Sequence, residues 1–145
     1  MNKLAKIRSI AERVRAKCEK FAMSKRSKRY DFHSKEDLNC MCAVASYTLS
    51  LALKKEDIDC NMFFGQFDGM YHCWVETKRH IVDITATQFG DDDFSKVFIS
   101  PKLIDGNDNI EHYDGGEAVD PNKMTDWGNQ RPNLKLSQRI LKVIA

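Results

Sequence analysis

The sequence predicts an α+β fold in which a central helix packs on an antiparallel sheet. An apolar run over residues 42–54 has the composition of a buried helix, since apolar side chains occupy most of its sides. Strand-like runs follow over 58–67, 70–76 and 79–85, and turn residues such as Asp68-Gly69 separate them. A helix and strands that occupy separate stretches of the chain are typical of α+β proteins.

Shorter elements are expected around this core. Apolar residues at three- and four-residue steps predict an amphipathic helix over 3–22 and a short C-terminal helix over 134–144. Phe94, Val97, Phe98 and Ile99 mark a candidate last strand, and Gly65 is expected at a bulge or a close approach. Residues 105–133 are rich in Asp, Asn, Gly and Pro, so we expect a long ordered loop there.

The length of 145 residues suits a single domain with a substantial core. Within it we expect an N-terminal helix and basic loop over 1–34 and a functional core over 35–100. An acidic loop and the C-terminal helix are expected over 101–145.

Composition argues against a membrane or secreted protein. Hydrophobic residues make up 42% of the chain and the mean hydropathy is −0.52, values typical of soluble globular proteins. No apolar run approaches the roughly 18 residues of a membrane span, and no apolar core follows the basic first residues. The odd number of cysteines, five, favours free thiols in a reducing compartment. We therefore expect a cytoplasmic protein.

Charge is distributed unevenly, although the net charge is only +2. Basic residues dominate 1–30 and acidic residues dominate 91–126. One interpretation is that the two regions attract each other in the fold. The other is a nucleic-acid surface, which would hold phosphates without reading bases because no aromatic residues are interleaved with the charges.

Three residues are placed in the local settings that thiol chemistry needs. Cys42 begins the apolar helical run, His72 lies in the second strand-like run, and Asp83 lies in the third. A helix N-terminus and a nearby imidazolium both lower the pKa of a thiol, and the thiolate is the nucleophile. A carboxylate beyond the imidazole fixes its tautomer. An Asp between apolar strand residues is costly unless it is paired, which makes Asp83 the most telling of the three.

The spacing of the last two residues predicts that they are neighbours. If Thr77 and Lys78 form a two-residue hairpin loop, position 72 lies directly opposite position 83. Directly paired residues on antiparallel strands have Cβ atoms about 4.5–5.5 Å apart on one face. A one-residue slip in register would place them on opposite faces.

These residues together resemble a known family. A Cys at the start of a helix, then His-Cys-Trp-Val-Glu over 72–76, then Val-Asp-Ile-Thr over 82–85, is similar to the transglutaminase-like branch of the papain-like cysteine hydrolases. The resemblance covers roughly residues 38–89. It implies a helix packed on an antiparallel sheet and a Cys-His-Asp triad in this chain order. The sequence departs from the family pattern in having Cys40, not Gly, two residues before the nucleophile, and Ser46 four residues after it.

Other residues are expected to support the triad. Trp74 shares a strand face with His72 and is expected to pack over the His–Asp pair. Gln88 is a candidate polar neighbour of the site or a substrate-facing group. The backbone N–H of Cys42 is a natural oxyanion donor at a helix start, and Asn39 is a candidate side-chain donor.

Two alternative assignments concern the cysteines. Cys40 is the alternative nucleophile. A zinc site is the alternative chemistry, because cysteine and histidine are the residues that bind zinc. The spacing is poor for such a site, since the adjacent residues His72 and Cys73 point to opposite faces of a strand. The candidate ligands are Cys40, Cys42, Cys60, His72 and Cys73.

The sequence thus predicts thiol-dependent acyl chemistry on an amide or ester of a protein or peptide substrate, with no cofactor. Cys42 would attack, His72 would move the proton, and Asp83 would orient the imidazole. The acyl acceptor could be water, as in a protease or deamidase, or an amine, as in a transglutaminase. The alternative function is a non-catalytic binding module of the same fold that docks a partner through its basic N-terminal segment.

Overall fold

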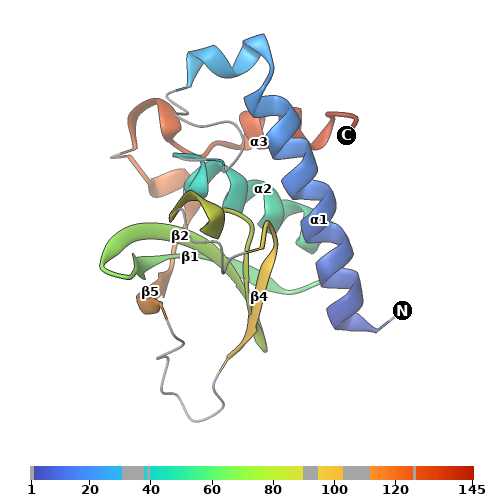
Figure 1. The fold of residues 1–145 in the computed structure, drawn as a ribbon, viewed down its shortest axis with the longest axis vertical. Helices are drawn as coiled ribbons and strands as arrows, with labels where there is room; N and C mark the ends of the chain where they lie inside the picture. The colour runs from blue at the N-terminus through green and yellow to red at the C-terminus, as the bar shows by residue number, and fades with distance from the viewer. Residues whose placement is uncertain (1, 31–37, 39, 90–94, 103–111, 126) are drawn as a thin grey trace.

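The computed structural model describes residues 2–30, 38, 40–89, 95–102, 112–125 and 127–145. Three α-helices and five strands make up most of this part of the chain (Figure 1). The helices are α1 (Lys3–Ala22), α2 (Cys42–Lys55) and α3 (Leu134–Leu141). The strands are β1 (Cys60–Phe67), β2 (Met70–Thr77), β3 (His80–Asp83), β4 (Phe98–Pro101) and β5 (Tyr113–Ala118). Short 3₁₀ helices include η1 (Lys25–Arg29), η2 (Ala86–Phe89), η3 (Pro121–Lys123) and η4 (Gly128–Gln130).

The strands form one antiparallel sheet in the order β4-β3-β2-β1-β5, so the predicted α+β class is confirmed. The turn between β1 and β2 has Asp68 at φ 48° and Gly69 at φ 82°. Two consecutive positive φ angles are what a tight two-residue hairpin requires, which explains the Asp-Gly pair.

The prediction of one long loop over 105–133 is wrong. This stretch contains β5, which pairs with β1 at the edge of the sheet, and two of the 3₁₀ helices. The sequence of β5 includes Asp114, Gly115, Gly116 and Glu117, which carry no strand signal. Pairing with β1 therefore overrides the local preference of this segment.

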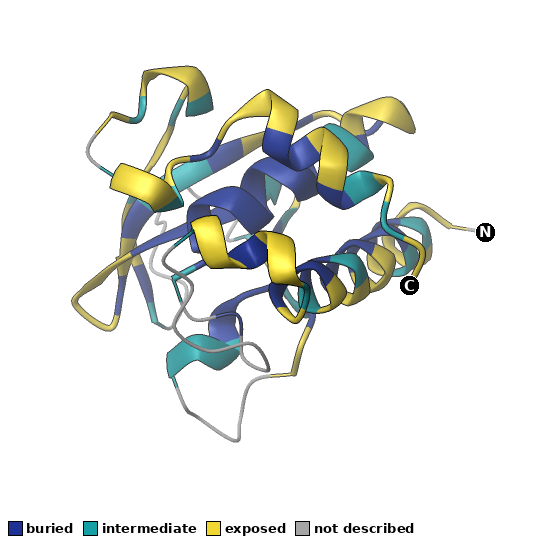
Figure 2. Ribbon diagram, turned by 90° about the horizontal axis from the view of Figure 1, so that it is seen from above, coloured by how far each residue is buried: buried dark blue, intermediate teal, exposed yellow. Residues whose placement is uncertain are grey.

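Helix α2 is the centre of the fold. Every residue from Cys42 to Ser50 is buried, and the helix contacts α1, α3, β1 and β2 (Figure 2). Its burial on all sides explains why its sequence is apolar almost throughout, as predicted. The main core joins side chains of α1, α2 and α3 to one face of the sheet, where Val75 and Val82 lie.

The predicted N-terminal amphipathic helix is present as α1. Its buried stripe includes Ile7, Ile10 and Val14, and Asn2 caps the helix by accepting a hydrogen bond from the Ala5 N–H at 2.7 Å. None of the described helices combines the length and the apolar character that crossing a membrane would require.

The basic residues of α1 do not all pair with acidic ones. Lys17 and Lys20 donate to the backbone carbonyls of Leu141 and Ile144, at 2.6 and 2.5 Å. They thus contact the end of α3, where the partial negative charge of a helix C-terminus favours cations.

Gly65 lies where the sequence expected a bulge or a close approach, and both are present. The register between β1 and β5 shifts between Phe64 and Gln66. A Cβ at Gly65 would lie 2.6 Å from Cη2 of Trp74 and 2.8 Å from the Asp114 carbonyl oxygen. The Trp74 indole therefore lies against the glycine backbone, with no room for a side chain between them.

A substitution at Gly116 of β5 tests the packing of the Trp74 indole against the glycine backbone. A Cβ there would lie 2.6 Å from Cζ2 of Trp74, with no backbone atom among its closest neighbours. We expect Gly116→Ala to destabilise the protein by about 1–3 kcal/mol in urea unfolding, because overpacking forces the indole to move. The smaller ring in Trp74→Phe should relieve most of that cost in a double-mutant cycle. Gly65→Ala should not be rescued, since its Cβ also meets backbone; equal rescue of both glycine variants would contradict the explanation.

Candidate functional site

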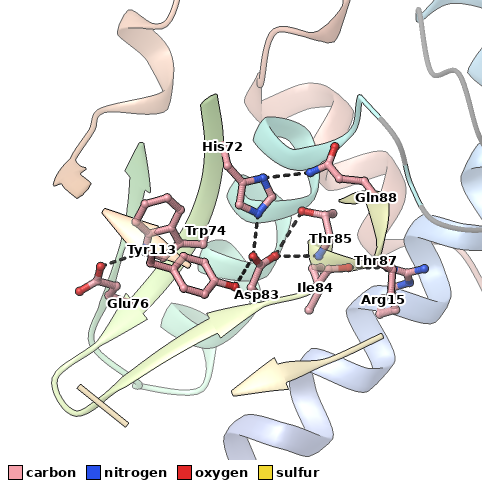
Figure 3. A network of polar contacts seen from close by, with 10 residues as sticks. All are labelled: Arg15, His72, Trp74, Glu76, Asp83, Ile84, Thr85, Thr87, Gln88 and Tyr113. Carbon is pink, nitrogen blue, oxygen red and sulfur yellow. Dashed lines mark hydrogen bonds and ion pairs between the residues drawn. The ribbon is translucent and has the colours of Figure 1, made fainter. Parts of the chain in front are cut away.

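The predicted contact between His72 and Asp83 is present, but the predicted register is wrong. The pairs Val75↔Val82 and Glu76↔Ile81 place the hairpin loop at residues 78–79. Continuing this register brings Asp83 opposite Trp74, two residues from His72. Since side chains alternate with a period of two, a two-residue shift keeps His72 and Asp83 on one face as diagonal neighbours. The His72 Nε2 lies 2.7 Å from Asp83 Oδ2 (Figure 3).

The Asp83 carboxylate is fully paired although it is 1% exposed. Oδ2 accepts hydrogen bonds from His72 and from the Tyr113 hydroxyl, both at 2.7 Å. Oδ1 accepts from the Thr85 backbone N–H at 2.8 Å and from the Thr85 hydroxyl at 3.3 Å. Burial raises the pKa of this carboxyl, but the charge and hydrogen bond of His72, with the bonds from Thr85 and Tyr113, outweigh burial and lower it. Asp83 is therefore held as an anion.

His72 has partners at both ring nitrogens. Nε2 faces Asp83, and Nδ1 lies 2.9 Å from the Gln88 side-chain nitrogen (Figure 3). The ring is completely buried. Burial lowers the pKa of His72, but the neighbouring Asp83 charge and hydrogen bond, followed by contact with Cys42, raise it to about 10. The imidazole is thus stabilised in its charged form.

Aromatic rings surround the His72 imidazole. Phe89 lies edge-on with 4.9 Å between ring centroids, Phe67 lies edge-on at 5.6 Å, and Trp74 is near-parallel at 6.0 Å. Trp74 thus packs beside the His–Asp pair, as its strand position predicted. Its indole N–H donates to Glu76 at 2.9 Å, which fixes the ring orientation. These rings exclude water and so strengthen the interaction between His72 and Asp83.

Cys42 reaches the site from the start of α2, where it shares a buried cluster with Cys73. The β2–β3 pairs reach only to Val75, and after Asp83 the chain turns into η2, so this ladder does not cover the Cys73 backbone. There the Cys42 thiol lies close to Cys73 and to the His72 ring, and both residues act on its pKa. The Cys73 thiol acts most strongly on the Cys42 pKa. With the His72 bond and charge it outweighs burial and holds that pKa well below its usual value.

The start of α2 adds to this effect. Cys42 is the first residue of the helix, the Met41 side chain makes no cap hydrogen bond, and the first turn has no acidic residue. The positive end of the helix dipole therefore acts on the Cys42 thiol. Cys40 has φ 69°, a left-handed conformation that glycine adopts most readily. Asn39 lies outside the described residues.

Cys18, Cys60 and Cys73 differ sharply from Cys42. Burial raises the pKa of Cys18 to about 12 and that of Cys60 to about 11. The hydrogen bond with Cys42, followed by burial, raises the Cys73 pKa. Among the described residues, no group of three or more His, Cys, Asp or Glu side chains is arranged to hold a metal ion.

Sequence reasoning missed three residues of the site. Tyr113 lies in the stretch that the sequence predicts as a loop, and its role depends on the pairing of β5 with β1. The sequence offers Cys73 only as a candidate zinc ligand. Arg15 is one of many basic residues in the N-terminal segment, yet it is 2% exposed and donates to the Ile84 carbonyl at 2.6 Å and to the Thr87 hydroxyl at 2.9 Å. Its position on the apolar side of α1, one residue after Val14, was the available signal.

Arg15 connects α1 to the site. The segment that it holds lies between Asp83 and Gln88 and leads into η2 (Figure 3). The Nε of the same guanidinium donates to Glu19 at 2.8 Å, so the Arg15 side chain is held by α1 as well as by the segment after β3. The arginine therefore sets where Gln88 lies relative to His72.

A groove of about 650 Å³ lies on the α2 side of the sheet. Phe64 and Tyr71 stack with 5.5 Å between their ring centroids, and Trp127 meets Phe64 edge-on at 5.9 Å. The groove is lined by Phe64, Tyr71, Val119, Lys123, Met124, Thr125 and Trp127. Four of these residues (Phe64, Val119, Met124 and Trp127) also pack against the buried cluster that contains Cys42 and Cys73. The groove is therefore contiguous with the surroundings of the Cys42 thiol.

Comparison of the chain with protein-family models, with curated proteins and with solved structures finds no match.

The Tyr113 hydroxyl provides a direct test of the carboxylate network. We expect Tyr113→Phe to destabilise the protein by about 1.5–3 kcal/mol, since it removes a hydrogen bond to a buried charge. Urea unfolding at neutral pH would measure this loss. Tyr71→Phe is the control, because Tyr71 is 72% exposed and its loss of a hydroxyl should change little. Equal effects of the two variants would show that Asp83 does not depend on Tyr113.

The raised pKa of His72 predicts how stability depends on pH. A histidine with a pKa raised from 6.5 to about 10 contributes stability that is full below pH 6.5 and is lost as pH rises through about 10. We therefore expect the difference in unfolding free energy between the wild type and His72→Gln to shrink over this range. Titrating groups that do not interact with His72 cancel in the difference, so a constant value would contradict the raised pKa of His72.

Proposed function

We propose that this protein catalyses thiol-dependent acyl chemistry on an amide or ester, with Cys42 as nucleophile, His72 as acid and base, and Asp83 as the residue that orients His72. The observation that carries the proposal is the buried His72–Asp83 pair, with 2.7 Å between Nε2 and Oδ2, in contact with a thiol of lowered pKa at a helix start. These are the parts that convert a thiol into a nucleophile and return the proton to a leaving group.

In the proposed reaction the Cys42 thiolate attacks the carbonyl carbon and forms a tetrahedral intermediate. The backbone N–H of Cys42, at the uncapped start of α2, would donate to the oxyanion. His72 protonates the leaving group from the nitrogen that does not face Asp83, and a thioester remains. Water or an amine then gives its proton to His72 and attacks the thioester, which regenerates the thiol.

Gln88 fits this cycle as a partner of His72 Nδ1. Its side-chain nitrogen lies 2.9 Å from that atom, as a donor to a neutral imidazole would. Rotation of the amide by half a turn would present the oxygen to the N–H of an imidazolium instead. The amide can therefore remain hydrogen-bonded to the ring in both protonation states, although it must yield to the leaving group during protonation.

The substrate class is proposed to be a protein or peptide. The groove beside the Cys42 cluster has a volume of about 650 Å³, within the usual range of ligand sites, and its floor is aromatic. A large apolar side chain next to the attacked carbonyl would bury against Phe64 and Trp127. The Lys123 ammonium at the same groove would favour substrates with a nearby carboxylate.

A resemblance to the transglutaminase-like branch of the papain-like hydrolases agrees with this proposal. The chain order Cys, His, Asp and the helix-on-sheet arrangement are the shared features. Family membership is part of the proposal.

Labelling with a peptide electrophile tests the proposed nucleophile. We expect a peptide acyloxymethyl ketone to modify Cys42 near neutral pH, because Cys18 and Cys60 remain protonated there. Mass spectrometry after digestion would identify the labelled residue.

Asp83→Asn should slow turnover of a peptide substrate by about 10⁴, the loss that the equivalent change causes in a serine protease.

Matched variants make the outcome decisive. Cys42→Ala should abolish labelling and turnover, whereas Cys40→Ala should keep both. The reverse result would make Cys40 the nucleophile. Slow, equal labelling of all five cysteines would favour a non-catalytic binding module instead, and the basic segment around η1 would then be the first surface to examine.

A further inference from the structure

We propose that Cys42 and Cys73 form a peroxide-responsive thiol pair, in which Cys73 closes a disulfide with oxidised Cys42. Both residues belong to one buried cluster, with Cys42 4% exposed and Cys73 fully buried. Each thiol acts on the pKa of the other, and both cysteines are free thiols in the structure. The disulfide does not depend on the proposed acyl chemistry; its effect on activity does.

The position of Cys73 suits this role. It follows His72 on β2, and its side chain points to the opposite face, toward the start of α2. The start of α2, where Cys42 lies, and Cys73 of β2 pack into the same small buried cluster. Formation of a bond of about 2.05 Å therefore requires the two sulfur atoms to close within this cluster, without exchange of strands or helices.

The chemistry is balanced with hydrogen peroxide as the oxidant. The Cys42 thiolate attacks one oxygen, the O–O bond breaks, and the hydroxide that leaves takes a proton from the His72 imidazolium to become water. Cys42 is then a sulfenic acid. The Cys73 sulfur attacks the Cys42 sulfur, the S–O bond breaks, and the hydroxide leaves as water with the Cys73 proton. The two thiols lose two electrons, and the peroxide is reduced to two molecules of water.

Oxidation of Cys42 also activates Cys73 for the second step. The hydrogen bond and the charge of the Cys42 thiolate are two of the causes that raise the Cys73 pKa, and burial is the other main cause. A sulfenic acid is neutral, so the contribution of the Cys42 charge disappears once it forms. The resolving thiol is therefore held protonated until its partner is oxidised.

Tryptic mapping after mild peroxide treatment tests the pair. Cleavage at lysines 35, 54, 55 and 78 places Cys40 and Cys42 in peptide 36–54, and Cys60 and Cys73 in peptide 56–78. We expect a disulfide-linked pair of these peptides in the wild type and in the double variant C40S/C60S. The link should be lost in C73S, where Cys42 should instead be found as sulfinic acid.

Electrophile labelling gives the functional readout. Peroxide should abolish labelling of Cys42 in the wild type and dithiothreitol should restore it, whereas in C73S the loss should be irreversible. Circular dichroism would establish that C73S is folded, and C73A serves as a second variant. Sulfinic acid at Cys42 in the wild type without a link, or a link that requires Cys40 or Cys60, would overturn the proposal. If the Cys42–Cys73 disulfide forms but the electrophile does not label Cys42 in the reduced protein, the thiol pair is upheld and the proposed acyl chemistry is refuted.

Discussion

The buried carboxylate of Asp83 is the constraint on which the rest of the site depends. An isolated anion in an apolar sheet would be strongly destabilising, so its four hydrogen bonds are conditions of folding as well as of chemistry. These bonds come from β2, from the segment after β3 and from β5. The carboxylate therefore connects three parts of the fold that are separate in sequence, and it gives His72 its orientation and charge.

The two faces of the sheet differ in what packs on them, and the site has residues from both. One face is covered by the helices around α2, and the other carries an aromatic cluster with Trp74, Tyr113 and Phe67. His72 belongs to the aromatic face, whereas Cys42 comes from the helical side. The ladder between β2 and β3 ends at Val75, and His72 and Cys42 meet beyond its end, where Cys42 and Cys73 share a buried cluster.

Glycines and one arginine position the surrounding elements. Gly65 and Gly116 allow β1 and β5 to lie against the Trp74 indole, which in turn packs on His72. Arg15 holds the chain between Asp83 and η2, so the placement of Gln88 depends on α1, a helix far from the thiol in sequence. Stability and the geometry of the candidate site are therefore coupled: the same contacts that bury Asp83 and Trp74 fix the imidazole.

The sequence by itself determined the local elements and the chemical types at the site. Periodicity placed α1, α2 and the β1–β2 hairpin within a few residues, because burial on one side or on all sides leaves a direct trace in composition. The setting of Asp83 among apolar residues indicated a paired carboxylate, and parity along the strands placed it on the same face as His72. These inferences depend on neighbours along the chain or across one tight turn.

Only the tertiary structure decided the rest. The register of the β2–β3 hairpin differs from the expected one because the loop lies at residues 78–79, which pairs Val75 with Val82. Both registers keep the same side chains on the core face, so the alternation in the sequence does not distinguish them. Strand β5, and with it Tyr113, forms by pairing with β1, since its own glycine-rich sequence has no strand preference. The thiol contact between Cys42 and Cys73 likewise arises where the start of α2 packs against β2, and such long-range contacts leave no periodic signal in the sequence.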